Sequence, residues 1–412
     1  MIKHILTLTA LASACGVACA QSGSSVTLYG IADAGVTRVS GLKAGTDTRL
    51  SSGIMDGSRW GLRGNEEIGG GYRAIFTMES RLELNNGSLS NRPASGAQVP
   101  DRFVSASLLG LPAPLQPAVT AVAAQIGSGI GVNVTNNVFD RQVFVGLVTP
   151  FGAVLAGRQY TPAYEVSATF DVMQTQSSLA AGQLASIPAS IDIRVSNALA
   201  YRAQFGAFSA SLMRTVEDAG VLKTLTGVMA MYKTDPFSVG IGYNTRKNEL
   251  GDKSLTSIVL GASAMIGPGT ISGLVASVKD DNPSDLSGIA ASLTPAVGAA
   301  TAGVVQNAFI NALKQDARLA HIGYRLPLGP HTFYVAYTAF NDKRPNNADA
   351  ASYGGAYSYS FSKRTDVNLV LTHFNNKGLA QAAPGGAGYL GGVTASAGTD
   401  SNSIALGLRH RF

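Results

Sequence analysis

The feature that most constrains this chain is a series of short segments in which apolar and polar residues alternate. Starting at Ser25 we count sixteen, and their connections are alternately very short and long. Period-two alternation predicts strands with one apolar and one polar face. The segments are 25–39, 50–63, 71–84, 138–149, 153–160, 196–204, 207–217, 222–234, 236–247, 254–266, 269–280, 316–327, 331–341, 351–362, 365–376 and 401–412.

The short connections are rich in Gly and Pro, which supply tight-turn geometry. They are 64–70, 150–152, 205–206, 235–236, 267–268, 327–330 and 362–364. Short turns at one end and long loops at the other are typical of barrels that cross an outer membrane. A soluble sandwich of short strands does not explain this regular alternation. We therefore predict an all-β fold, a 16-stranded antiparallel transmembrane β-barrel.

The faces of individual segments agree with this prediction. In 71–84, an apolar face with Tyr72, Phe76 and Met78 opposes a polar face. Lipid outside and water inside require this arrangement. The segment 138–149 is an exception, because its alternation places Gln142 on the outer face. Lipid does not suit that side chain, so we predict a subunit contact near the early strands.

The first twenty residues have the composition of a secretory signal peptide. A basic start precedes the apolar run 5–14, and 18–20 is a small-x-small cleavage site. A membrane anchor needs a longer apolar run. Lipidation at Cys15 or Cys19 is a second alternative, although neither has Leu three residues earlier. We expect a signal peptide at 1–20 and one barrel domain at 21–412, which then contains no cysteine.

Composition and motifs exclude several functions. Charged residues make up 14% of the chain and form no basic cluster with interleaved aromatics, so we expect no nucleic-acid partner. The histidines of the mature chain are scattered, with no nucleophile elbow and no metal-ligand spacing. We therefore expect no enzyme activity, no metal and no cofactor.

Three long connections stand out. The one that follows the segment 153–160 is predicted to fold back into the barrel and narrow a water-filled channel. The connections 85–137 and 281–315 are rich in Ala, Val and Gly. In the second, Pro295, Asn307 and Asn311 argue against a membrane span, and we expect a short helix on the outer face.

Five stretches of the chain resemble one known family. They are SSVTLYGIADAGV at 24–36, SRWGLRGNEEIGGGYRAIF at 58–76, RQVFVGL at 141–147, AGRQYTP at 156–162 and the C-terminal GLRHRF. They are similar to the Gram-negative general diffusion porins, most closely the beta-proteobacterial type. This resemblance covers nearly the whole mature chain. It implies a homotrimeric outer-membrane porin with a third loop folded inward.

The resemblance also implies a set of pore residues. Arg59, Arg141 and Arg194 match positions where such porins carry a wall cluster of arginines, and Arg158 is expected as a fourth. Glu165 and Asp171 lie in the loop that supplies opposing carboxylates. Fixed guanidiniums facing carboxylates create a transverse field that favours dipolar solutes. The alternative is that each arginine is an ordinary polar lumen residue or ties the loop to the wall.

Further expectations concern the wall and the partners. Residues predicted to line the pore are Arg63, Arg73, Glu79 and Arg81. Phe412, the terminal outward aromatic, resembles the signal that barrel assembly machinery recognises. We expect contact with outer-membrane lipid and lipopolysaccharide, and passive diffusion of small hydrophilic solutes and ions with mild anion preference. A substrate-specific channel is one alternative; a non-conducting adhesin or structural barrel is another.

Overall fold

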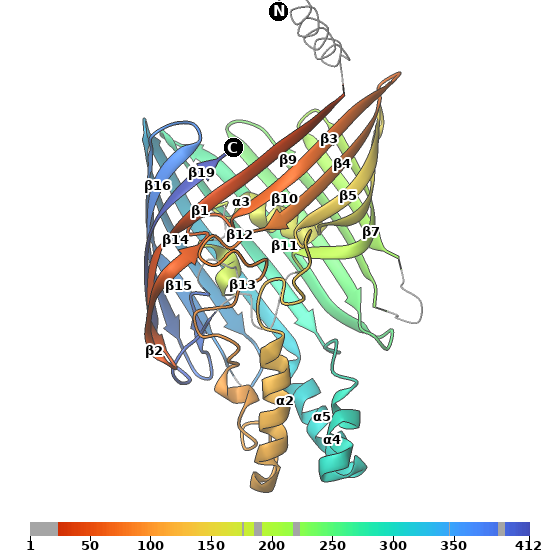
Figure 1. The fold of residues 1–412 in the computed structure, drawn as a ribbon, viewed down its shortest axis with the longest axis vertical. Helices are drawn as coiled ribbons and strands as arrows, with labels where there is room; N and C mark the ends of the chain where they lie inside the picture. The colour runs from red at the N-terminus through yellow and green to blue at the C-terminus, as the bar shows by residue number, and fades with distance from the viewer. Residues whose placement is uncertain (1–23, 175–176, 185–191, 217–222, 346, 386–391) are drawn as a thin grey trace, which may run out of the picture.

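The computed structural model describes residues 24–174, 177–184, 192–216, 223–345, 347–385 and 392–412. Most of them form one antiparallel sheet that closes into a barrel (Figure 1). The predicted signal peptide at 1–20 lies outside the described residues. The strands of the sheet are β1 (Ser25–Leu42), β2 (Gly45–Ser52), β3 (Arg59–Gly69), β4 (Tyr72–Arg81), β5 (Gln142–Thr149), β6 (Gly152–Tyr160), β7 (Arg194–Phe205), β8 (Phe208–Thr215), β9 (Leu225–Lys233), β10 (Phe237–Lys247), β11 (Lys253–Ile266), β12 (Gly269–Asp280), β13 (Gln315–Leu328), β14 (His331–Asp342), β15 (Ala350–Ser360), β16 (Thr365–Asn376) and β19 (Ser401–Arg411).

The first and last strands close the barrel. β1 pairs with β19 from Ile31 opposite Arg411 to Ser40 opposite Asn402. The last residue, Phe412, completes the seam because its backbone exchanges two hydrogen bonds with Gly30. Both β2 and β3 pair with β1, so they are two parts of one barrel strand. The 17 strand segments therefore form a wall of 16 strands, which confirms the predicted fold class.

The break between β2 and β3 corrects the prediction of one strand over 50–63. Residues 53–58 leave the ladder because the Asp33 carboxylate on β1 accepts hydrogen bonds from three consecutive backbone N–H groups. Their donors are Ile54, Met55 and Asp56, at 2.9, 2.9 and 2.8 Å. A carboxylate that satisfies three amides is a strong local competitor of strand pairing. Asp33 itself is fully buried.

The two ends of the barrel differ as predicted, with one exception. Seven short turns lie at one end, here called the turn end, where Figure 1 also places the C-terminus. At the other, the loop end, the long loops are loop 2 (82–141), loop 3 (161–193), loop 6 (281–314) and loop 8 (377–400). Loop 8 contains a small hairpin of β17 (Ala382–Ala383) and β18 (Gly392–Val393). The first connection, predicted to be long, is only Lys43-Ala44.

The outer face of the wall is apolar and the inner face polar. Ile241 and Leu406 are about half exposed on the outside, whereas Ser352 and Ser358 are buried on the inside. Gln142 does not face outward, because it pairs with Glu79 of β4 on the inner face. Exposed Val145 on β5 faces outward, and Gln142 has the opposite parity, so it faces inward. The prediction was wrong because it treated Arg141, which precedes the strand, as an inward residue of the same alternation. The argument for a subunit contact at that residue therefore fails.

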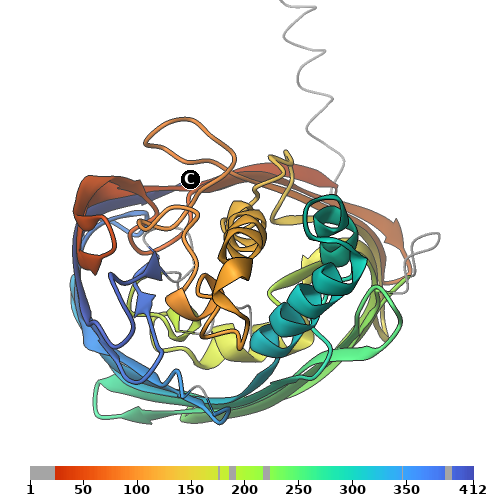
Figure 2. The ribbon, with the colours of Figure 1, turned by 90° about the horizontal axis from the view of Figure 1, so that it is seen from below.

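Loops 2 and 6 form a helical cap at the loop end. It contains α2 (Gln116–Ser128), α4 (Ile289–Val297) and α5 (Ala299–Leu313) with the short 3-10 helices η1 (Asp101–Phe103) and η2 (Ala113–Leu115). Val119, Val122, Val305 and Phe309 are buried in a shared apolar core. Figure 2, viewed from the loop end, shows these helices within the outline of the barrel. In the described part of the chain, no helix is long and apolar enough to cross a membrane.

The helices of the cap differ in number from those predicted. The short helix expected in 281–315 is present as two helices, and α2 was not predicted. Glu249 anchors the start of the helical pair, because its carboxylate accepts hydrogen bonds from the backbone N–H groups of Asp285 and Ser287. Burial alone would raise the pKa of Glu249, but these bonds offset it and lower the pKa to about 2. The anchor is therefore ionised at every physiological pH.

Candidate functional site: a constriction inside the barrel

Loop 3 lies inside the barrel against the wall, as predicted. It begins with α3 (Pro162–Phe170), whose first turn is capped by Thr161, the residue that accepts a hydrogen bond from Tyr164. Asn244 of β10 fixes this start to the wall. Its side chain donates to Thr161 Oγ1 at 2.9 Å and accepts from the Ala163 backbone N–H at 3.2 Å. The helix is thus held at both its cap and its first turn.

Glycines in the wall make room for the buried face of α3. A Cβ added at Gly261 would lie 2.2 Å from the Phe170 ring, and one at Gly242 would lie 2.7 Å from Ala163 Cα. Phe170, Ala163 and Val166 are completely buried. The helix packs on the inner face of β9, β10, β11 and β12 (Figure 2). Because these strands present little side-chain volume, the loop lies flat against them and leaves part of the lumen open.

We expect the substitution Gly261→Ala to destabilise the docked loop by about 1–3 kcal/mol, since the new methyl group overpacks against Phe170. Urea unfolding in detergent micelles measures this cost, and limited proteolysis of loop 3 reports its release. Gly355→Ala on β15 is the matched control, because its Cβ would meet only the Tyr334 carbonyl oxygen at 3.2 Å. Equal stability of the two variants would contradict the docking argument.

Asp171 follows α3 and forms no ion pair with an arginine among the described residues. Its carboxylate accepts hydrogen bonds from the backbone N–H groups of Met173 and Ala181, at 2.9 and 2.8 Å. It also lies 3.5 Å from Nε2 of His321 on β13, and that nitrogen accepts from the Val172 N–H. Asp171 therefore borders the same cavity as Arg59 and Arg141 without pairing with either. Its hydrogen bonds fold the second half of the loop.

Opposite α3, the wall carries a buried charge network. Arg141 donates from Nε to Glu79 at 2.7 Å, and both side chains are almost completely buried. Tyr29 donates to the second oxygen of Glu79 at 3.0 Å. The Tyr160 hydroxyl accepts from Arg141 and from Arg194, at 3.3 and 2.8 Å. The Arg194 guanidinium also lies 4.4 Å above the Tyr160 ring.

Tyrosine connects this network to the loop. The rings of Tyr160 and Tyr164 stack with their centroids 5.1 Å apart, which joins the wall to α3. Two further ion pairs flank the stack: Arg59 with Asp56 at 3.2 Å, and Arg202 with Glu165 of α3 at 2.6 Å. Arg194 has no carboxylate partner among the described residues. Its charge at this level of the lumen is only partly balanced, since Glu79, the acid with which it interacts, is already paired with Arg141.

A cavity of about 610 Å³ separates loop 3 from the wall. Arg59, Arg141, Tyr160, Glu165 and Arg202 line it. The other charged groups that line it are Asp56, Asp171 and Lys233. Four cationic and three acidic side chains thus face this space. Glu79, the partner of Arg141, balances this count, and Arg194 beside the cavity then gives a polar constriction with a small excess of positive charge.

The structure brings together Arg59, Arg141 and Arg194 but not Arg158. The register places Arg158 opposite Val143, on the outward face that carries exposed Val145. Its guanidinium donates to the Asp140 carbonyl and to Ser196 Oγ. The physical reason is simple alternation: Arg158 has the parity of exposed Val154, whereas Gln159 is completely buried on the inner side. Tyr160, Arg202 and Asp56 complete the site and were missed, although Tyr160 lies within the quoted motif at 156–162.

The four predicted pore-lining residues fall into two pairs. Arg63 and Arg73 are exposed on the inner face near the turn end, where Arg63 stacks on Tyr29 at 3.9 Å. Glu79 and Arg81 are buried, and Arg81 pairs with Glu83 and Asp140 at 3.2 and 3.4 Å. The second pair supports the wall beneath loop 2 and has little access to the lumen.

Fold and site together define a class: a β-barrel that crosses the outer membrane and encloses a charged constriction built by an inward loop. The chain belongs to the Gram-negative porin family, whose model matches residues 7–379. It is 26% identical to outer membrane porin protein 32 of Delftia acidovorans over the full length of both chains. A second relative, an outer membrane porin protein of Bordetella pertussis, is 38% identical over 102 residues, covering 21% of this chain and 26% of the relative.

Solved structures agree on the fold. An anion-selective porin from Comamonas acidovorans has a TM-score of 0.68 at 22% identity, covering 94% of this chain and 100% of the other. The trimer form of OmpT from Vibrio cholerae has a TM-score of 0.58 at 13% identity, covering 95% and 100%. The protein is thus an outer-membrane porin, with the loop end of its barrel toward the cell surface.

Proposed function

We propose that this porin is a passive pore for small hydrophilic solutes and ions, with a mild preference for anions. The observation that carries the preference is the charge at the constriction. Counted with Glu79, the partner of Arg141, the lining carries equal numbers of cationic and acidic side chains, and Arg194 beside it forms no ion pair with a carboxylate among the described residues. Fixed charge in a narrow passage with low-dielectric walls enriches the opposite ion. Arg59, Arg141 and Arg194 with Glu165 are the residues that set this field.

The cap supports placing selectivity in the lumen. Residues 103–139 of loop 2 and 286–313 of loop 6 contain no charged side chain. These two segments of the cap therefore add no charge of either sign to the path of an ion. The structurally similar porin from Comamonas acidovorans is described as anion-selective, which agrees with the proposed preference for anions.

We propose a homotrimer, because one solved structure of the same fold is described as a trimer. Lipopolysaccharide and the barrel assembly machinery are further proposed partners. Phe412 is half exposed on the outer face, where a recognition signal for assembly can be read. No cofactor and no enzyme activity belong to this proposal.

Conductance of the purified protein in planar bilayers tests the pore. We expect an ohmic conductance. Under a salt gradient, we expect a reversal potential whose sign shows that anions permeate more readily than cations. The preference should weaken at high salt, since the Debye length falls from about 10 Å at 0.1 M to about 3 Å at 1 M. Saturation by one solute would instead indicate a substrate-specific channel. Absence of conductance would favour an adhesin or structural barrel and reject the proposal.

A further inference from the structure

One buried arginine of the cap has no partner of opposite charge. The buried arginines in the described part of the chain are Arg81, Arg102, Arg141 and Arg409. Three of them form ion pairs with carboxylates at distances between 2.6 and 3.4 Å. Arg102, in η1 of loop 2, forms no ion pair among the described residues. A buried charge is costly unless it is paired, so this position requires an explanation.

The Arg102 guanidinium is held in a fixed position. The residue is 7% exposed, and its guanidinium lies 4.7 Å from the centroid of the Phe103 ring. One nitrogen, Nη1, donates a hydrogen bond to the Leu379 carbonyl of loop 8 at 3.1 Å. The Nε–H group is buried and has no hydrogen-bond partner among the described residues. Since buried polar groups are almost always hydrogen-bonded, this donor points to a missing acceptor.

The charged residues nearest to Arg102 do not neutralise it. Asp342 is bound to Arg344 by two hydrogen bonds of 2.8 Å, and Asp101 pairs with Lys43 at 2.7 Å. Burial and the like charge of Arg344 lower the pKa of Arg102 to about 10, and Asp342 offsets this only in part. Arg102 is therefore still charged at pH 7 and lacks a counter-charge from its neighbours.

Arg102 lines a small cavity where three loops meet the barrel wall. Loop 3 contributes Gln183 and loop 8 contributes Gln381, while β14 and β15 close the other side. The cavity volume is about 40 Å³. One water needs roughly 10–15 Å³ on this measure, so the cavity has room for a small ion but not for an organic solute. The segments 185–191 and 386–391, which adjoin lining residues in sequence, contain no acidic residue.

The cavity lies at the junction between the cap and the inward loop. The backbone N–H group of Asp101 donates to the Gln381 side chain at 2.6 Å, which joins loop 2 to loop 8. The Gln183 side chain accepts from the Gly385 N–H group at 3.0 Å, which joins loop 3 to loop 8. An ion in the cavity is therefore in a position to contact all three loops at once.

We propose that this cavity binds chloride, or another monovalent inorganic anion of that size, at Nε of Arg102. A single negative charge balances the single guanidinium, and the cavity excludes larger anions by its volume. The bound ion fastens loop 2 to loops 3 and 8. The site is separate from the constriction, because Arg102 does not line the cavity between α3 and the wall.

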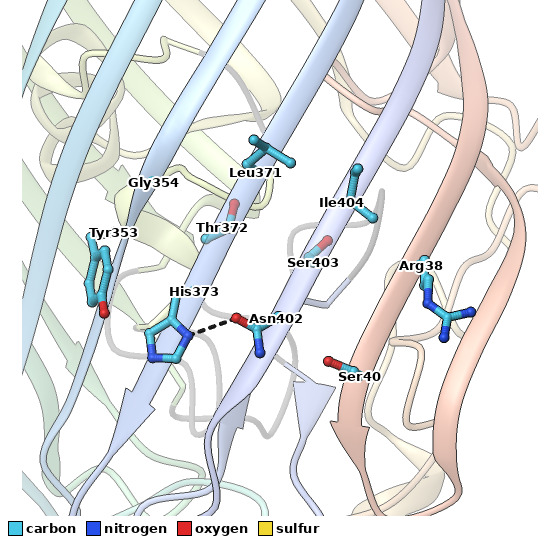
Figure 3. Close-up of a pocket in the computed structure, with 10 residues that line it drawn as sticks. All are labelled: Arg38, Ser40, Tyr353, Gly354, Leu371, Thr372, His373, Asn402, Ser403 and Ile404. Carbon is cyan, nitrogen blue, oxygen red and sulfur yellow. Dashed lines mark hydrogen bonds between the residues drawn. The ribbon is translucent and has the colours of Figure 1, made fainter.

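Arg38 provides a contrasting arginine for the test. It borders an open groove of about 400 Å³ on the outer face of the barrel (Figure 3). Like Arg102 it forms no ion pair among the described residues, and it donates to Thr48 at 3.3 Å. Its guanidinium is exposed, however, so its charge does not require a fixed partner from this chain. Arg38→Met is therefore the matched control for Arg102→Met.

Crystals of the purified protein grown in bromide test the site directly. Bromide has the charge of chloride, is only slightly larger, and is located by its anomalous scattering. We expect an anomalous peak within hydrogen-bond distance of Arg102 Nε in the unchanged protein and in Arg38→Met. Arg102→Met should show no peak there, because Met occupies the space without a charge. Absence of the peak from the unchanged protein would overturn the proposal and assign the cavity to water.

Hydrogen exchange in detergent tests whether the ion acts in solution. Backbone amides of loops 2 and 8 are compared in chloride and in gluconate, which is too large for the cavity, at equal ionic strength. At a chloride concentration ten times the Kd, exchange through opening of the cap should slow about tenfold, since protection scales with bound ligand. Arg102→Met should exchange equally in both salts. Equal exchange of the unchanged protein in the two salts would contradict the proposal, as would an undiminished chloride effect in Arg102→Met.

Discussion

Replacing Arg141 with Ser is expected to lower the free energy of unfolding by about 3–5 kcal/mol, because the Glu79 carboxylate would remain buried without its charged partner. Both side chains are almost inaccessible, and the pair is only 2.7 Å apart. Tyr29 would still donate a hydrogen bond to Glu79, but it carries no charge. Urea unfolding in detergent, followed by the fluorescence of the single tryptophan, Trp60, measures the loss.

Arg73→Ser is the matched control. Arg73 also lies on the inner face, but its pair with Glu67 is exposed and 3.7 Å long, so its loss should cost only about 0–1 kcal/mol. The double variant Glu79→Met with Arg141→Met removes both charges, and we expect it to recover most of the stability. If Arg141→Ser is no less stable than Arg73→Ser, the buried pair does not support the wall.

The wall was predictable because its signals are local. Alternation in 236–247 fixes which residues face lipid, and Gly267-Pro268 marks a turn without knowledge of any distant residue. The docking of loop 3 also has a sequence signal. Gly240, Gly242 and Gly261 leave an inner wall without side chains, and a loop can lie only where such room exists. This signal becomes visible once the strands are paired.

Some errors arise where a distant residue overrides a local pattern. Asp33 interrupts the second barrel strand through the backbone of 54–56, some twenty residues away. The carboxylate of Asp171 accepts hydrogen bonds within its own loop. Both cases depend on three-dimensional proximity, which alternation along the chain does not encode. Arg158 is a different error, because alternation from exposed Val154 already places it on the outer face and only the family resemblance suggested the lumen.

The cap helices illustrate a different limit. α2, α4 and α5 contain few strong helix-start signals, and no side chain caps any of them. Their order comes from the apolar core that loops 2 and 6 share, so neither loop predicts it alone. The pairing of two loops more than a hundred residues apart becomes apparent only in the folded chain.

We expect the double variant Arg59→Ser with Arg194→Ser to shift the reversal potential toward cations. Arg59 lines the cavity, and its loss leaves Asp56 with a second partner, Arg409 at 2.6 Å. Among the described residues, no carboxylate forms an ion pair with Arg194, so its substitution leaves no acid unpaired. Both substitutions therefore remove positive charge without creating an unpaired buried acid. Arg141 is unsuitable for this experiment, because its loss would destabilise the wall.

The size of the shift follows from Coulomb's law. A unit charge about 4 Å from a passing ion contributes about 1 kcal/mol in water, which raises the local anion concentration about fivefold and lowers that of cations about fivefold for each arginine. Glu165→Gln should shift the potential the opposite way, since it frees the Arg202 guanidinium that Glu165 now neutralises. Arg73→Ser, near the turn end, should have a small effect. An unchanged reversal potential in the double variant would show that the ion path avoids the arginine wall, and the proposed constriction would then be misplaced.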